Sequence, residues 1–372
     1  MFLYKFEFVE EAMHQKRLGD MASYVNGYAF KPEQRGKVGL PIIRIQDLTG
    51  NVYDLGFYDG DYPKKVEIND GDVLISWSAS LGVYEWNRGK ALLNQHIFKV
   101  VFDKLTVDKK FFMYAVKYKL EEMESKAHGA TMKHITKKDF DNTVISFPTI
   151  VEQERISNTL NKLHTIIDSK KFQLEKLDNL IKARFVEMFG DKDFEKKPFK
   201  DVCEELFAGG DVKRDRTVKD ADSNHSYPVF TNGEKDGGLY GYTDVARVTK
   251  PSITISGRGT IGFCLVRAEP FYPAIRLIVA IPKENLVTPS YLKYFIDSKD
   301  YSGRGASIPQ LTIPMIKDEP VPIPPIKIQK EFESIVAQVD KSKFTLQNSI
   351  ISLMNLWYNI NQYVCERMYG EA

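Results

Sequence analysis

Polar side chains that can bond a ligand gather in short glycine-containing segments that occur twice in this sequence. The first copy holds ISWSASLG (75–82) and GATMKHIT (129–136), and the second holds ISGRGTIG (255–262) and GASIPQLT (305–312). Hydroxyl, amide, imidazole and guanidinium groups can bond the edges of nucleic-acid bases and phosphate oxygens. These segments therefore favour recognition of a ligand through hydrogen bonds.

The candidate contact residues are the polar side chains in these segments and near the strand-like runs around them. Arginine and lysine suit guanine or phosphate, asparagine and glutamine suit adenine, and serine and threonine suit either base or phosphate. In the first copy the candidates are Tyr28, Lys31, Ser76, Ser78, Ser80, Asn94, His96, His128, Thr131, Lys133 and His134. In the second copy they are Arg258, Thr260, Arg276, Arg304, Ser307 and Gln310. The repeated segments match in spacing and in their glycine positions, whereas their polar side chains differ. This pattern favours two similar domains that read two different half-sites.

No arrangement of residues typical of an enzyme is found. The sequence lacks a Gly-x4-Gly-Lys-Ser/Thr loop, an HExxH pair, paired metal-binding cysteines and the motifs of adenine methyltransferases. The glycine-rich segments 257–260 and 303–307 follow no strand–helix pattern and are predicted turns. The three cysteines are far apart and are interpreted as buried apolar residues: Cys203, Cys264 and Cys365. The sequence predicts no catalytic residue, metal or cofactor of its own.

The elements that must position these residues are themselves repeated. Collinear matches lie at offsets of 180 and 176: HIFKVV (96–101) on RLIVAI (276–281), and FPTIVEQERI (147–156) on IPPIKIQKEF (323–332). Several matches in one order predict a tandem duplication. In each copy, short β-branched runs broken by Gly, Asn and Asp predict strands, and a helical pattern at 109–124 or 290–299 interrupts them. The predicted fold is α+β, with two tandem α/β domains.

A long helix follows each α/β region, after a boundary marked by proline. Apolar residues recur at alternating steps of four and three, which predicts a coiled-coil seam; a helix lying on its own domain would drift by about 20° per heptad. The first seam is Ile156, Leu160, Leu163, Ile167, Lys170, Leu174, Leu177, Ile181, Arg184 and Met188. The second is Phe332, Val336, Val339, Lys343, Leu346, Ile350, Leu353, Trp357, Ile360, Val364 and Arg367. Two such helices in one chain are predicted to pair antiparallel.

The domain boundaries follow from this plan. We expect an N-terminal segment, a first recognition domain, a first spacer helix, a second domain and a second spacer helix, at 1–16, 17–148, 149–190, 191–324 and 325–370. The residues expected to form the spacer and to bind partner subunits are Gln153, Ile156, Leu163, Leu174, Leu177, Gln329, Phe332, Val339, Leu353 and Trp357.

Charge and composition limit the class of protein. The 372 residues carry 52 basic and 50 acidic side chains, a net charge of +2, so a stand-alone nucleic-acid binder is not indicated. If the chain binds DNA, the positive charge must be local or be supplied by partners. No apolar run of about 18 residues is found, which predicts no membrane span. The N-terminus does not read as a secretory signal, and separated cysteines fit a reducing compartment, so we expect a cytoplasmic protein.

These features together resemble the specificity (S) subunit of type I restriction-modification enzymes. That family begins its long helices with a P-P-L-x-E-Q-x-x-I pattern, of which the first copy keeps Pro148, Glu152, Gln153 and Ile156. The second copy keeps Pro324, Pro325 and Gln329 but has Ile328 and Phe332 at the other two positions. The segments 18–31 and 173–191 also look like family segments, and 199–210 is a looser match. The resemblance covers nearly the whole chain.

The resemblance implies a non-catalytic subunit whose two domains each read one half of a bipartite, asymmetric site in double-stranded DNA. It also implies two docked modification (methyltransferase) subunits that bind S-adenosylmethionine, and restriction subunits that supply ATP- and Mg-dependent translocation and cleavage. A subunit of a related two-part restriction-methylation enzyme is the nearest variant. The alternative from a different class is a coiled-coil scaffold with two protein- or ligand-binding heads and no DNA.

Overall fold

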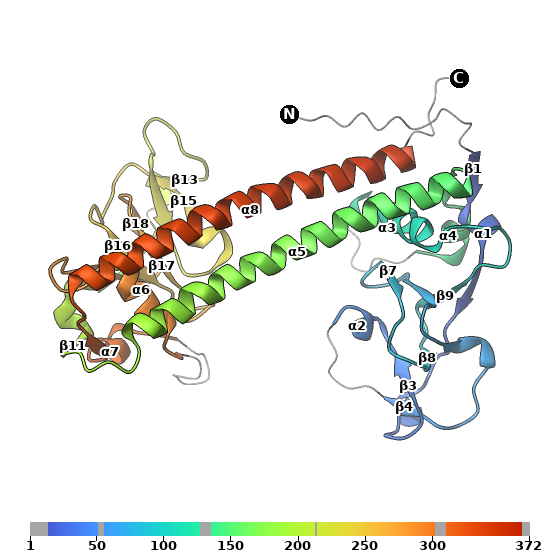
Figure 1. The fold of residues 1–372 in the computed structure, drawn as a ribbon, viewed down its shortest axis with the longest axis horizontal. Helices are drawn as coiled ribbons and strands as arrows, with labels where there is room; N and C mark the ends of the chain where they lie inside the picture. The colour runs from blue at the N-terminus through green and yellow to red at the C-terminus, as the bar shows by residue number, and fades with distance from the viewer. Residues whose placement is uncertain (1–13, 51–55, 127–134, 213, 302–309, 367–372) are drawn as a thin grey trace. The chain divides into compact units, whose positions relative to one another are not determined.

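The computed structural model of this chain describes residues 14–50, 56–126, 135–212, 214–301 and 310–366. The chain divides into two units, residues 1–170 with 349–372 and residues 171–348. Each unit holds one α/β domain and a part of each of the two long helices (Figure 1). We call the α/β parts the first head (residues 14–149) and the second head (residues 190–325).

The first head is built on two four-stranded sheets. The main sheet has the order β2 (Ser23–Asn26), β9 (Ile97–Val101), β6 (Val73–Ser76), β7 (Gly82–Glu85). The smaller sheet has the order β4 (Phe57–Tyr58), β3 (Leu40–Ile43), β8 (Ala91–Leu93), β5 (Glu67–Ile68). A further antiparallel pair joins β1 (His14–Arg17) to β10 (Val144–Phe147). The helices of this head are α1 (Leu18–Met21), α2 (Ile45–Leu48), α3 (Lys109–Lys126) and α4 (Lys137–Asn142).

The second head repeats this plan. Its main sheet has the order β12 (Cys203–Ala208), β19 (Ile278–Pro282), β16 (Ser252–Ile255), β17 (Cys264–Arg267). The smaller sheet has the order β13 (Thr217–Val218), β15 (Leu239–Thr243), β14 (Tyr227–Phe230), β18 (Tyr272–Pro273). The pair β11 (Lys196–Pro198) and β20 (Pro320–Pro322) corresponds to β1 and β10, and the helices are α6 (Pro289–Asp297) and α7 (Ile313–Ile316).

The strand register confirms the predicted duplication. Ile75 of β6 lies opposite Phe98 of β9, and Ile255 of β16 lies opposite Ile278 of β19, so both members of the pair are displaced by the offset of 180 found in the sequence. In each head two strands of the smaller sheet also run parallel, β3 with β8 and β14 with β18. The two copies therefore share the strand order of the main sheet and the register of its central pair, although they share few residues. Their smaller sheets differ, because the parallel pair is central in the first head and at an edge in the second.

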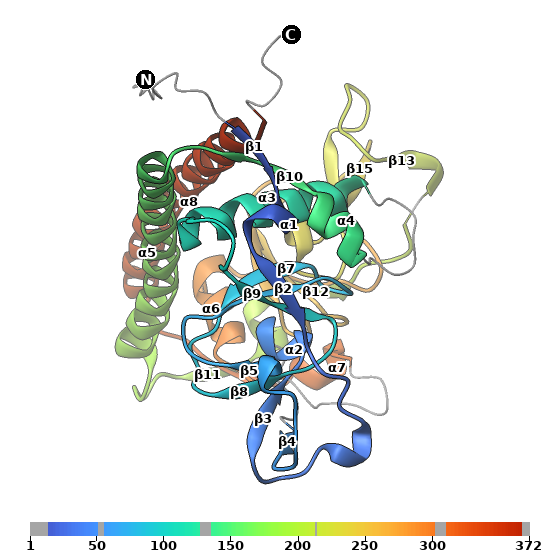
Figure 2. The same ribbon diagram turned by 90° about the vertical axis from the view of Figure 1, so that its right-hand side faces the viewer.

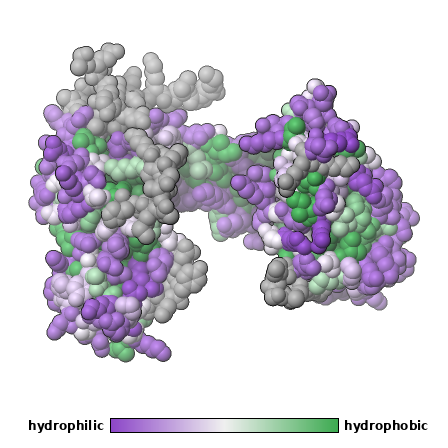
Figure 3. Space-filling model, turned by 180° about the vertical axis from the view of Figure 1, so that it is seen from behind, coloured by the Kyte–Doolittle hydropathy of each residue, from purple (hydrophilic) through white to green (hydrophobic). Residues whose placement is uncertain are grey.

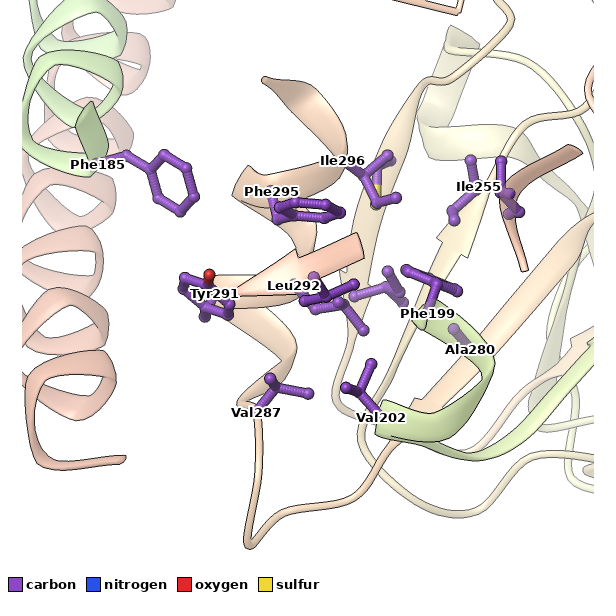
Figure 4. Packing of buried hydrophobic residues seen from close by; sticks show 14 of the residues in the cluster. Phe185, Phe199, Val202, Ile255, Ala280, Val287, Tyr291, Leu292, Phe295 and Ile296 are labelled. Carbon is purple, nitrogen blue, oxygen red and sulfur yellow. The ribbon is translucent and has the colours of Figure 1, made fainter. Parts of the chain in front are cut away.

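The core of the second head forms where α6 lies between the main sheet and α5. Tyr291, Leu292 and Phe295 of α6 face Ile255 and Ala280 from the sheet on one side and Phe185 from α5 on the other (Figure 4). Fully burying a side chain of this size contributes about 1.5–3 kcal/mol, so this one helix ties the sheet to the long helix. The first head has the same layering, with Phe112 and Val116 of α3 on the sheet side.

The two long helices predicted by the heptads are α5 (Ile150–Phe189) and α8 (Ile326–Glu366), and they pack antiparallel (Figure 1). Within residues 171–348, the end of α5 meets the start of α8, because the rings of Phe185 and Phe189 each lie 5.5 Å from the ring of Phe332. Earlier on α5, Asp178 accepts a charged hydrogen bond of 2.5 Å from Lys343, later on α8. Residue numbers thus rise along one helix as they fall along the other.

In the other unit, the start of α5 packs on α3 and on the last turns of α8. Ile156 and Leu160 share a buried cluster with Phe111 of α3 and Ile360 of α8, and Trp357 packs against it. Figures 1 and 2 show α3 beside the start of α5. The Tyr114 hydroxyl donates a 2.7 Å hydrogen bond to Asn161 Oδ1, which adds a polar link between these two helices. In the first head, α3 thus attaches the domain to α5, as α6 does in the second head.

The predicted seam is confirmed along most of both helices and is wrong at the end of α5. The buried or half-buried seam positions include Ile156, Leu163, Leu174, Leu177, Phe332, Val339, Leu353 and Trp357. After Ile181 the buried residues are Phe185 and Phe189, whereas Arg184 is exposed and pairs with Glu187 at 2.6 Å. The line of buried residues here departs from the heptad positions and follows the 3.6-residue period of a straight helix. It does so because this end of α5 contacts α6 as well as α8.

Two buried glutamines attach the long helices to the heads. Gln153 accepts a 2.9 Å hydrogen bond from the backbone N–H of Asp108, which caps α3, and donates to Pro148 O at 2.8 Å. Gln329 accepts at 2.8 Å from the N–H of Thr288, which caps α6, and donates to the carbonyls of Leu286 and Pro324 at 2.9 and 2.8 Å. Both side chains are fully buried. This placement corrects the expectation that they face a partner, since their amides are satisfied inside their own heads.

We predict that Gln329→Ala lowers the free energy of unfolding by about 1–3 kcal/mol, because it leaves the buried Thr288 N–H without its acceptor. Chemical denaturation followed by circular dichroism measures the change. Gln173→Ala, at an exposed position of α5, is the matched control and is expected to cost little. Equal midpoints for the two variants would contradict the anchoring role of Gln329.

Candidate nucleic-acid interface

The first head carries a cleft where several predicted contact residues meet. Its volume is about 460 Å³, and its lining includes the predicted residues Ser80, Asn94 and His96. It also includes polar residues that are not among the predicted contact residues: Arg35, Arg44, Gln46, Thr49 and Gln95. One wall comes from the turn before β9 and another from α2, so the cleft joins residues that are about 50 positions apart in sequence.

A left-handed residue forms the turn before β9. His96 has φ +71°, a conformation that non-glycine residues seldom adopt and that often occurs at functional sites. The turn is held by Tyr28, whose N–H donates to Leu93 O at 2.9 Å and whose carbonyl accepts from Gln95 N–H at 3.0 Å. Gly27 is required beside it, because a Cβ there would lie 1.9 Å from Asn94 O.

The second head repeats the turn at the equivalent place. Ile275 and Arg276, before β19, have φ +51° and +59°, and Arg276 is the counterpart of His96 at the offset of 180. Ile275 N–H donates to Gly210 O at 2.7 Å, as Gln95 does to Tyr28. Gly209 is in the place of Gly27, and a Cβ there would lie 2.6 Å from the backbone of Pro273. Each head thus presents one polar residue with a left-handed backbone just before equivalent strands, His96 before β9 and Arg276 before β19.

Three predicted residues also meet in a cleft of the second head. Arg258, Arg276 and Gln310 line a cavity of about 240 Å³, and Arg258 Nη2 donates to Gln310 Oε1 at 3.4 Å. Asn232 braces the loops behind it, since its amide accepts from Gly257 N–H at 2.8 Å and donates to Ile275 O at 2.5 Å. Asn232 was not predicted from the sequence, because nothing in its local pattern marks it.

The other predicted contact residues in the described part of the chain lie outside the two clefts and differ in exposure. Ser76 is fully buried and its hydroxyl donates to Ser80 O at 2.5 Å, so it shapes the loop after β6 from within. Ser78 is half-buried, while Thr260 and Lys31 are exposed, and Tyr28 is 38% exposed with its ring 4.9 Å from that of Phe30. Six predicted residues lie outside the described part of the chain: His128, Thr131, Lys133, His134, Arg304 and Ser307.

The described cysteines are not suited to catalysis. Burial raises the pKa of the Cys203 thiol to about 12 and raises that of Cys264 well above its ordinary value. A thiol is a nucleophile only as the thiolate, so both remain inert near neutral pH. Within the described residues, no three His, Cys, Asp or Glu side chains form a group that could hold a metal ion. The same residues contain no helix long and apolar enough to cross a membrane.

The chain matches a known family model twice. Residues 10–179 and 191–355 match the "Type I restriction modification DNA specificity domain". The type I specificity subunit S.MpnORF507P of Mycoplasma pneumoniae is 25% identical over 79% of this chain and 82% of its own length. The EcoBI specificity subunit of Escherichia coli is 29% identical over 44% of this chain and 35% of its own length.

Solved structures support the same fold. A type I restriction-modification S subunit from M. genitalium superposes with a TM-score of 0.57 at 17% identity, covering 97% of this chain and 98% of its own. A chain from a study of the assembly and conformational transition of the type I R-M system gives a TM-score of 0.60 at 15% identity, covering 95% and 97%. With two family domains along most of its length, this chain belongs to the DNA specificity subunits of type I restriction-modification systems.

We predict that Gly209→Ala destabilises the protein by about 1–3 kcal/mol and weakens DNA binding, because the new Cβ would displace the turn that carries Arg276. Thermal unfolding and titration with target DNA measure the two effects. Gly210→Ala is the matched control, since a Cβ at that neighbouring position meets nothing within 4 Å. Similar behaviour of the two variants would refute the requirement for close approach at Gly209.

Proposed function

We propose that the two clefts are the DNA-reading surfaces of this chain, one for each half of a bipartite site. The observation that carries the proposal is the duplicated left-handed turn, which presents His96 in one head and Arg276 in the other. The same backbone with different side chains suits two half-sites of unlike sequence. The chain itself performs recognition, and methylation and cleavage belong to its partners. The comparisons give no support to a scaffold that does not bind DNA.

The antiparallel helices are proposed to set the distance between the half-sites. α5 and α8 contain 40 and 41 residues, so each measures about 60 Å at 1.5 Å per residue. Each unit contains a part of both helices, and the change from one unit to the other falls after Lys170 on α5 and after Asn348 on α8. A change of helix length at these two points leaves the hydrophobic core of both units untouched.

Exposed apolar residues on the helices are proposed to dock methyltransferase subunits. Ile351, Met354 and Tyr358 of α8 are 57%, 49% and 49% exposed and follow helical spacing on one face. On the part of α5 in the other unit, Phe172, Leu180 and Val186 are 55%, 45% and 62% exposed. Figure 3 shows hydrophobic side chains along the long helices among hydrophilic ones. Exposed apolar side chains grouped in this way are typical of protein–protein contacts.

In the proposed complex, the partner subunits supply the catalytic activities and further contacts to DNA. Two methyltransferase subunits would bring S-adenosylmethionine and cationic contacts to the DNA backbone, which accounts for a net charge of only +2. Restriction subunits would bring ATP- and Mg-dependent translocation and cleavage. We place the complex in the cytoplasm, where its DNA substrate lies.

Docking through α8 predicts that Ile351→Lys loses one of the two methyltransferase subunits. A charge buried in an apolar contact lacks a partner, so affinity at that site should fall at least tenfold. Analytical ultracentrifugation of the purified complex gives the stoichiometry. Asn359→Lys, exposed and about 80–140° around α8 from these three residues, should keep both subunits. An intact complex with Ile351→Lys would place the docking site elsewhere.

The spacer proposal predicts a change in the target site. Inserting seven residues after Lys170 and seven after Asn348 adds two helical turns and about 10 Å, while keeping the heptad phase. At about 3.4 Å per base pair, the spacer of the methylated motif should lengthen by about three base pairs. Mapping of methylated adenines reads the spacer directly. If an assembled, active complex methylates a motif with an unchanged DNA spacer, the length of the helices does not set the distance between the half-sites.

A further inference from the structure

We propose that the cleft of the first head reads a G·C base pair, with Arg44 and Arg35 donating to the guanine and Asn94 Oδ1 accepting from the cytosine amino group. The inference rests on the proposed function and assigns a base pair to one of its two surfaces. It depends on the unsatisfied polar atoms of the cleft, on the way Arg44 is held, and on the pattern of groups in the major groove.

Three buried polar atoms in the lining have no partner among the described residues. They are Arg35 Nε, Asn94 Oδ1 and His96 Nδ1, and all three residues line the same cleft. Asn94 is only 7% exposed, so its carbonyl oxygen has little access to bulk water. Leaving such a group unpaired costs free energy, and native structures contain few of them. A single ligand that carries both hydrogen-bond acceptors and a hydrogen-bond donor could pair with these three atoms.

Arg44 is positioned by a buried carboxylate. Asp47 is 1% exposed, and its Oδ2 accepts from the Arg44 backbone N–H at 2.8 Å and from Arg44 Nε at 3.5 Å. These bonds fix the start of α2 and hold the base of the guanidinium, whose side chain is 17% exposed at the cleft. Arg88 Nη2 donates to Asp47 O at 2.6 Å and braces α2 from outside the cleft lining. Asp47 is thus a positioning residue for Arg44.

The cleft's groups match a G·C pair. In the major groove this pair offers two acceptors on guanine, N7 and O6, and one donor on cytosine, the N4 amino group. Two arginines supply donors for the guanine edge, and arginine to guanine is the commonest specific contact. The unpaired Asn94 Oδ1 supplies the acceptor for the amino group. An A·T pair offers a donor between two acceptors and presents no adjacent acceptor pair to an arginine.

The second head lacks this set. Its smaller cleft has Arg258 bonded to Gln310, and its turn presents Ile275 in place of Gln95 and Ala274 in place of Asn94 at the offset of 180. No carboxylate lines this cleft or caps an arginine there among the described lining residues. The assigned base pair is therefore specific to the first head, and substitution of its residues should alter one half of the target alone.

The test is methylation mapping with the complete complex carrying Arg44→Ala or Arg44→Lys. Both variants should relax one G·C position in one half of the motif, with discrimination against A·T falling about tenfold or more, while the other half stays unchanged. Lysine keeps the charge but loses the forked pair of donors that fits guanine N7 and O6, so it should not restore full discrimination at this position. Arg258→Ala should alter the opposite half. Arg17→Ala, at an exposed position of the first head, is the control and should leave the motif intact.

Three outcomes would overturn the assignment. An unchanged motif and rate with both variants would mean that the cleft reads no base. A uniform loss of methylation with an unchanged motif, rescued by Arg44→Lys, would mean a phosphate contact. Relaxation at an A·T position would mean that the wrong pair is assigned. If the unaltered complex produces no bipartite motif, the proposed function itself fails, which is distinct from all three. Thermal unfolding of each variant confirms that it is folded.

Discussion

The structure depends on the attachment of each long helix to its own head through one buried side-chain amide. Gln153 and Gln329 each bond the N–H of the residue that caps a helix of the head and the proline carbonyl that precedes the long helix. The amide thus fixes where the long helix starts and in what direction it leaves. A head whose helix left at another angle could not also bury Phe111 against Ile156, or Tyr291 against Phe185. Each head therefore fixes the start of its own long helix in the same way.

A second constraint acts at the end of the central strand of each main sheet. The chain enters β9 and β19 through left-handed residues, and glycine is required next to the turn because the backbones approach too closely for a Cβ. The strain is kept because hydrogen bonds with Tyr28, with the Gly210 carbonyl and with the Asn232 amide hold the turns in place. Rigid backbone with replaceable side chains is what a family of recognition proteins needs, since target sequences can change without loss of the fold.

The sequence predicted the parts of this fold that depend on periodicity. The offset of 180 predicted the duplication, which the central strand pair of each main sheet shows in its register. The heptads predicted the helix pair up to Ile181. Periodicity failed at Arg184 because the last turns of α5 contact a head as well as a helix. Of the site, Ser80, Asn94, His96, Arg258, Arg276 and Gln310 were predicted and do line clefts. Arg35 and Arg44 were missed because they lie outside the segments that match between the two copies, and long-range folding brings them to the turn before β9. The glutamines were recognised as a motif, but the motif gave no sign that their amides turn inward.

The central claim is that this chain directs methylation to a split DNA sequence. The most direct measurement is a map of methylated adenines in cells that express the methyltransferase subunit with and without this chain. We expect methylation of one non-palindromic motif in two parts, found only when the chain is present. Methylation that does not depend on the chain, or none at all from a complex shown to be assembled, would contradict it.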